Sequence, residues 1–249
     1  MNDFNNDPTL RRVRGLLKKA ESLYSIGDEN SVREAEAANA LAAKLISKHG
    51  IDQALLADKG EIKDVIVNKL IPLSAVYQND KRVLFNSIVH ALGAQVIFIR
   101  SRRPGTAQSY TLSAHVFAYE SDMARIELLF EMLQPQMLLG AAAAHVPYWE
   151  NARSFRKSWM SGFISAIHGR LKATKKEATK EAGTGTDLVL FNREKAVEVA
   201  YKATFDPKHT INSAPRRLAG SGREQGYAAG QKASFGGNNI GGSRRALAG

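Results

Sequence analysis

Residues 152–182 read ARSFRKSWMSGFISAIHGRLKATKKEATKEA and contain a clear periodic pattern. Large apolar residues recur at every fourth position, at Phe155, Trp159, Phe163, Ile167 and Leu171. Because an α-helix returns to nearly the same face after four residues, this spacing predicts one long helix whose apolar face packs on a core. The apolar positions stop at Leu171, so we expect the last third of the helix to extend past that core.

The same stretch is strongly basic. It holds eight basic residues against two acidic ones, which gives a net charge of +6. The basic residues are Arg153, Arg156, Lys157, Arg170, Lys172, Lys175, Lys176 and Lys180. Lysines one helical turn apart repel each other by roughly 0.2–0.5 kcal/mol per pair. Two interpretations follow: a solvated helix end whose charge suits the helix dipole, or a surface that is occupied by an anion.

Residues 206–249 form a second basic segment, with seven basic residues against two acidic ones and a net charge of +5. Its candidate phosphate contacts are Arg216, Arg217, Arg223, Lys232, Arg244 and Arg245. The glycine-rich composition predicts a flexible tail, within which residues 223–235 could form two turns of helix. Ala228, Ala229 and Ala233 are small enough there for close packing. The two basic segments account for the whole net charge of +11, which favours an acidic partner such as nucleic acid.

The first 60 residues predict a helical hairpin. A first helix begins near Pro8 and has an apolar face made of Leu10, Val13, Leu16, Leu17, Ala20 and Leu23. A second helix is expected over residues 32–48, with Ser31 and Glu34 as a capping box and Gly50 as its left-handed end. His49 then falls in the last turn, where an imidazole favours the negative end of the helix dipole.

Three short segments of this region carry a resemblance: Lys-Ala-Glu-Ser at 19–22, Glu-Ala-Glu-Ala at 34–37 and Lys-His-Gly-Ile-Asp at 48–52. With the leucine-rich first helix, they resemble the opening of a bacteriophage and bacterial protein family of unknown function. Residues 80–205, above all RSFRKSWMSGF at 153–163, are more loosely similar to the domain that usually follows it. The resemblance implies an architecture and a phage or mobile-element origin, and it implies no activity, cofactor or catalytic residue.

Residues 61–205 predict a helix-rich α+β domain. Strands are expected at 62–73, 94–100 and 109–118, and helices at 79–93, 120–146, 152–182 and 192–205. Residues 187–191 are compatible with a further strand, Pro72 is expected to end the first strand, and Pro135 is expected to break or kink the long helix. The order strand, helix, strand, strand, helix is typical of a ferredoxin-like split unit or of a less regular α+β domain. The predicted fold class is therefore α+β, with a helical hairpin in 1–60, a small, mainly antiparallel sheet in 61–205 and a flexible tail in 206–249.

The sequence lacks the motifs of several kinds of functional site. The chain has no cysteine, which excludes disulfides, thiolate zinc sites, iron–sulfur clusters and a cysteine nucleophile. It also lacks a His-Glu-x-x-His pair, a phosphate-binding loop and a nucleophile elbow, and its six histidines show no ligand spacing. No apolar run approaches the roughly 20 residues of a membrane span, and the first residues lack the apolar centre of a secretory signal. We therefore expect a cytoplasmic protein, in the host cytoplasm if phage-encoded, with no cofactor, no metal and no membrane contact.

These observations predict a non-enzymatic nucleic-acid-binding accessory protein whose helix at 151–182 and tail contact phosphates. The alternative is an interaction or assembly protein, able to form a homo-oligomer, that binds an acidic host or phage protein. Its docking faces would be the alanine-rich surfaces at Ala35, Ala38, Ala42 and 141–144. A hydrolase with an unrecognised site is the third interpretation. Tyr110 and Phe117, on the hairpin with Arg100, Arg102 and Arg103, are the candidates for base stacking.

Overall fold

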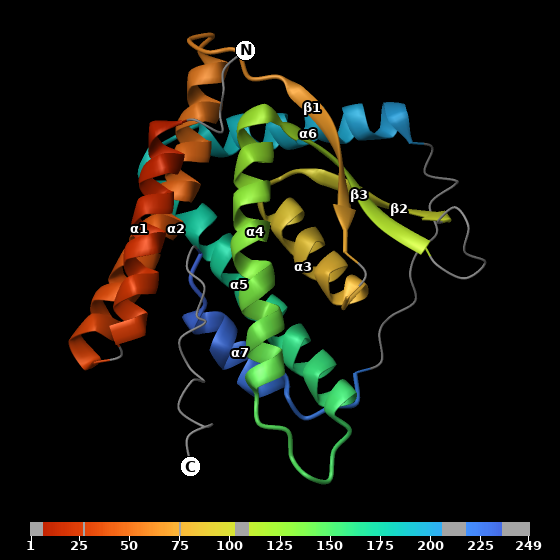
Figure 1. Cartoon of the computed structure of the whole chain (residues 1–249). Helices are drawn as coiled ribbons and strands as arrows, with labels where there is room; N and C mark the ends of the chain where they lie inside the picture. Colours follow the sequence, from red (N-terminus) through yellow and green to blue (C-terminus); the bar gives the residue numbers. More distant parts are fainter. Residues whose placement is uncertain (1–6, 27, 75, 103–109, 206–217, 236–249) are drawn as a thin grey trace.

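The computed structural model describes residues 7–26, 28–74, 76–102, 110–205 and 218–235 (Figure 1). Helices α1 (Pro8–Ile26) and α2 (Glu29–Asp58) form the N-terminal hairpin. A three-stranded sheet with helices α3 (Gln78–Ala91) and α4 (Glu120–Ala143) follows, and then come α5 (Ala152–Ala182), α6 (Thr186–Thr204) and α7 (Arg223–Lys232). The predicted α+β class, rich in helix with a small antiparallel sheet, is confirmed.

The hairpin forms as expected, but both ends of α2 differ from the prediction. Leu10, Val13 and Ala20 of α1 are fully buried, as their spacing indicated. The cap of α2 is Asp28, whose carboxylate accepts a hydrogen bond from the Ser31 amide at 2.8 Å, so Ser31 is not the cap. The helix also runs through Gly50 to Asp58, so the predicted stop at Gly50 was wrong.

The sheet consists of β1 (Ile66–Leu73), β2 (Gln95–Arg102) and β3 (Tyr110–Tyr119), in the order β1-β3-β2 and antiparallel throughout. Because β3 lies between the other two, β1 and β2 run in the same direction and α3 connects them, which makes a split β-α-β unit. Pro72 does not end β1, since this is an edge strand and a missing amide donor is tolerated there.

Two helices differ from their expected form. Residues 187–191, compatible with a further strand, are the first turns of α6. A five-residue apolar run cannot be assigned to strand or helix by its period alone. Helix α4 is not broken at Pro135 and continues to Ala143.

One large core connects most elements of the described chain. It combines apolar side chains from α1, α2, α3, the sheet, α4 and α5 with two residues that follow α7, Ala233 and Phe235. The five apolar residues of α5 that predicted its buried face are each at most 6% exposed. On the sheet, Leu112, Ala114, Val116 and Ala118 face this core, while Phe117 on the other face packs against Tyr201 and Phe205.

Helix α7 lies along α5 at very close range (Figure 1). Gly222, Gly226 and Gly230, spaced four residues apart, face the backbone of α5. A Cβ atom added to Gly226 would lie 1.8 Å from the carbonyl oxygen of Trp159, which leaves no room for a side chain. The predicted helix near 223–235 is confirmed. Ala229 and Ala233 pack on the core as expected, Ala228 is exposed, and glycines make the closest contact with α5.

Polar contacts also hold the segment around α7. The amide side chain of Gln136 in α4 donates to the carbonyl oxygen of Ser234 at 2.6 Å and accepts from the Ser234 amide at 2.9 Å. At the other end, the carboxylate of Glu150 accepts a hydrogen bond from the Ser221 amide at 2.9 Å. Residues 218–235 are therefore packed on the body of the protein, and this part of the tail is not the free arm that its composition predicted. Residues 206–217 and 236–249 lie outside the described residues.

We expect Gly226→Ala to lower the free energy of unfolding by about 1–3 kcal/mol, because the new methyl group meets backbone that cannot move aside. Alanine has the higher helix propensity, so a loss of stability isolates the steric contact. Urea denaturation measures the change.

The matched control is Gly169→Ala on α5, where nothing lies within 4 Å of the new Cβ. It should stabilise the protein by about 0.5–1 kcal/mol. If Gly226→Ala is as stable as Gly169→Ala, α7 does not lie against α5 in solution.

Candidate nucleic-acid interface

Three of the predicted basic residues line one open groove. Arg153, Arg156 and Lys157 lie on the first turns of α5, at spacings of three and four residues that place them on neighbouring positions of one face. The groove has a volume of about 870 Å³ and its remaining lining residues are Val76, Tyr77, Gln78, Asn79, Asp80 and Ala152. It therefore lies where α3 and α5 both begin, and Figure 1 shows the starts of these two helices on the same side of the molecule.

The cations of this groove have no acidic partner among the described residues. Asp80, which also lines the groove, is only 2% exposed. The Nε atom of Arg156 is buried without a hydrogen-bond partner in the described part of the chain. Like charges this close together repel each other, so an anion bound between them would stabilise the surface.

The backbone at the start of α3 adds to this preference. The Tyr77 side chain does not cap α3, and the Tyr77 carbonyl oxygen accepts hydrogen bonds from the amides of Asp80 and Lys81 at 3.0 Å. Tyr77 has a left-handed backbone with φ 49°, which costs a non-glycine residue roughly 1 kcal/mol or more. The positive end of the α3 dipole favours anions and thus complements the three cations.

The lysines at the far end of α5 form a separate group. Lys172, Lys176 and Lys180 are exposed, whereas Lys175 forms an ion pair with Glu194 of α6 at 2.7 Å. At 1.5 Å per residue, about 40 Å of helix separates Arg153 from Lys180. The structure therefore does not bring all the predicted phosphate contacts of α5 together, because the lysines at its far end do not line this groove.

Arg170 has a structural role, and its assignment as a phosphate contact stays a prediction. Its guanidinium donates hydrogen bonds to the carbonyl oxygens of Gly230 at 2.9 Å and Ala233 at 2.6 Å. It also lies 4.2 Å from the centre of the Phe235 ring. These contacts use the guanidinium to hold the end of α7 against α5.

The remaining predicted residues are scattered. Arg223 and Lys232 are exposed at the two ends of α7. Arg216, Arg217, Arg244 and Arg245 lie outside the described residues. Phe117 is 2% exposed and cannot stack on a base, which corrects its assignment.

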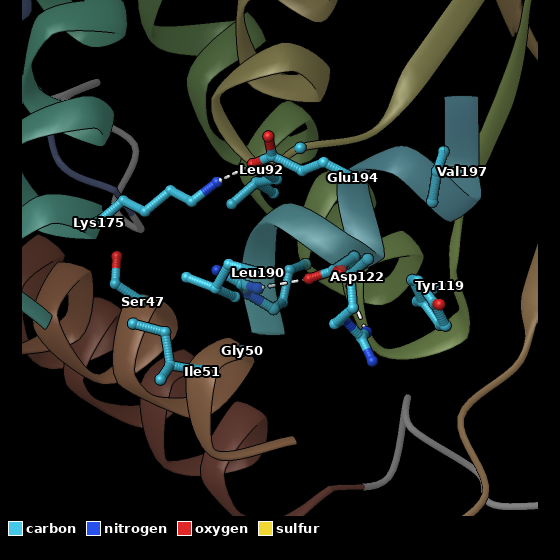
Figure 2. A pocket seen from close by; sticks show the side chains of 13 residues that line it. Ser47, Gly50, Ile51, Leu92, Tyr119, Asp122, Lys175, Leu190, Glu194 and Val197 are labelled. Carbon is cyan, nitrogen blue, oxygen red and sulfur yellow. Dashed lines mark hydrogen bonds and ion pairs between the residues drawn. The ribbon is translucent and has the colours of Figure 1, made fainter. Parts of the chain in front are cut away.

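A second polar cluster is buried where α2, α4 and α6 meet (Figure 2). The guanidinium of Arg125 lies 2.6 Å from the carboxylate of Asp122. The guanidinium of Arg193 lies 2.6 Å from the carboxylate of Asp64 and 3.4 Å from that of Asp122. Figure 2 shows Lys175 reaching toward Glu194 at the edge of the same cavity. Burial lowers the pKa of Arg125, and Asp122 opposes this shift.

The His49-Gly50 pair of the N-terminal motif belongs to this cluster. A Cβ on Gly50 would lie 1.6 Å from an Nη atom of Arg125, so any larger residue here would require the guanidinium to move. His49 is 4% exposed and its Nε2 lies 3.7 Å from the carboxylate of Asp7. The predicted role of His49 in a last helical turn was wrong, because α2 continues beyond it.

The cavity beside this cluster holds about 30 Å³, enough for water but far below the several hundred Å³ of a metabolite pocket. Within the described residues, no three histidine or acidic side chains come together in a way that could hold a metal ion. The cluster thus connects helices around a cavity of the size of a water molecule.

Comparison with known proteins supports the N-terminal resemblance. Residues 9–53 match a family described as "Protein of unknown function (DUF2786)", and the match includes His49 and Gly50. Neither a curated protein nor a solved structure matches the chain. In the described ranges, no helix is both long and apolar enough to span a membrane.

The buried His49 predicts a pH dependence of stability. Burial lowers the pKa of His49 and the nearby Arg125 lowers it further, while Asp7, Asp52 and Asp122 oppose the shift. As the pH falls below about 6.5, the unfolded chain takes up a proton that the folded protein does not yet bind. We therefore expect the free energy of unfolding to fall between pH 7 and pH 5, by at most about 1.4 kcal/mol per pH unit from this group.

The His49→Gln variant should lose less stability than the wild type over that range, measured by urea denaturation at each pH. His145→Gln, which changes an exposed histidine, is the control and should keep the wild-type slope. Equal slopes in the wild type and in His49→Gln would contradict this assignment.

Proposed function

We propose that this protein is a non-enzymatic nucleic-acid-binding accessory protein that acts in the cytoplasm, and that the groove between α3 and α5 receives a phosphate backbone. The observation that carries the proposal is the set of three cations in this groove, Arg153, Arg156 and Lys157, which have no acidic partner in the described ranges. The N-terminal resemblance supports the further proposal that the protein is encoded by a phage or mobile element.

A polymer of phosphates fits the distribution of charge better than a single small anion does. The exposed lysines Lys172, Lys176 and Lys180 extend the positive potential along α5, at a distance that one small anion could not reach from the groove. Such contacts are mainly electrostatic, so binding should weaken steeply with salt and depend little on base sequence.

The alternative of an assembly protein loses one of the two faces that suggested it. Ala35, Ala38 and Ala42 are at most 9% exposed because they pack inside the protein, so this face holds the protein's own helices together. At the end of α4, Ala141 is 3% exposed, whereas Ala142 and Ala143 are exposed, so the alternative now depends on these two residues.

The test is to measure oligonucleotide binding by fluorescence anisotropy at several salt concentrations. For the triple variant Arg153→Gln, Arg156→Gln, Lys157→Gln, we expect the slope of log K against log salt to fall by about 2–3, because each removed cation leaves about one phosphate without its neutralising charge. Affinity should fall to a similar extent for all base sequences.

The control is Lys48→Gln, Lys59→Gln, Lys63→Gln, which removes the same charge from exposed positions on and after the second half of α2. Its slope should stay close to that of the wild type. Circular dichroism verifies that both variants fold. If the wild type binds neither DNA nor RNA at low salt, or if the slope falls equally in both variants, the proposed interface is wrong.

A further inference from the structure

Two aromatic side chains extend into solvent just before α5. Tyr148 is 95% exposed and Trp149 is 74% exposed, the highest values among the large apolar side chains of the described residues. Their rings are in edge contact, with centroids 4.8 Å apart and planes at 87°. Rings of this size are usually buried at least in part, so their exposure as a pair points to a binding role.

The backbone under this pair is held in place. The Glu150 amide donates to the carbonyl oxygen of Pro147 at 3.0 Å, which closes a turn with Tyr148 and Trp149 at its tip. The carboxylate of Glu150 accepts from the amide and the hydroxyl of Ser221, and Asn151 caps α5. The aromatic pair is thus presented by a fixed turn, which lowers the entropic cost of binding.

Tyr148 and Trp149 lie close in the sequence to the basic residues of the groove. Trp149 is four residues from Arg153, and the turn leads directly into α5 at the bottom of Figure 1. A polymer whose phosphates occupy the groove can therefore place its next residues against the two rings.

We propose that Tyr148 and Trp149 stack on the bases of a single-stranded nucleic acid whose phosphates contact Arg153, Arg156 and Lys157. The inference rests on the proposed function and narrows its ligand class. Aromatic rings beside a cationic groove are typical of single-strand-binding surfaces, because each base offers an aromatic face. In a duplex these faces are covered by neighbouring bases, so the rings would add little to duplex affinity.

The experiment compares a single-stranded oligonucleotide with a duplex of the same length, using the full chain. Tyr148→Ala and Trp149→Ala should each weaken single-strand binding about tenfold and change duplex binding less than twofold. The control is Phe191→Ala, an aromatic residue on α6 that is 53% exposed, which should leave both affinities unchanged.

Tryptophan fluorescence gives a second, direct readout. The chain has two tryptophans, and Trp159 is 4% exposed and stacked on Phe163. Single-stranded oligonucleotide should therefore quench Trp149, and the quenching should disappear in Trp149→Phe.

The outcomes separate this inference from the proposed function. If single strand and duplex bind equally and the alanine variants change neither affinity, the stacking inference is wrong while the basic interface stands. If neither nucleic acid binds at low salt, the proposed function itself fails. Two further outcomes would overturn the inference: a blue shift of Trp149 with anionic lipid vesicles but not with oligonucleotide, or self-association that the alanine variants abolish.

Discussion

The burial of one face of α5 is the constraint on which the rest of the structure depends. This helix contacts α2, α3, α4, α6 and α7, so five other elements are positioned against it. Its large side chains Phe155, Trp159 and Phe163 are nearly fully buried, which makes the helix the centre of the core. Because the same helix carries the cations of the groove, the packing that forms the core also fixes the position of the charged surface.

The C-terminal segment connects this core to the proposed interface. Glycines allow α7 to approach α5 at backbone distance, and Arg170 holds its end through two carbonyl oxygens. The same segment supplies Ser221, which fixes Glu150 and with it the turn that presents Tyr148 and Trp149. A stretch whose composition resembles a flexible arm is therefore a structural support for the surface that we propose to bind nucleic acid.

The buried charges serve a different purpose. Arg125 and Arg193 are paired with Asp64 and Asp122, and removing one partner of such a buried pair leaves an uncompensated charge at high energetic cost. Among the described residues of α6, only Thr186 and Val197 are buried, so these polar contacts and the ring contact of Tyr201 with Phe117 both attach the helix. The closeness of Arg125 to Gly50 gives a physical reason for glycine in the N-terminal motif.

The sequence by itself determined what depends on local periodicity and composition: the helical hairpin, the length of α5 and its buried face, the strand-helix-strand-strand order of the α+β domain and the concentration of positive charge. The sequence did not show that Arg170 binds backbone carbonyl oxygens while Arg153 lines the groove. Two arginines on one helix differ only in the residues that lie opposite them in the fold. From the sequence, the start of α6 was also compatible with a strand, and α2 was expected to end at Gly50. A short apolar run can form a strand or a helix, and a glycine can end a helix or lie within one, so their neighbours in the fold decide. Only the tertiary structure decided which cations of the described chain lie without an acidic partner, why Gly222, Gly226 and Gly230 are needed, and that the two aromatic rings before α5 are exposed. These properties depend on contacts between residues that are distant in the chain, and no local pattern encodes them.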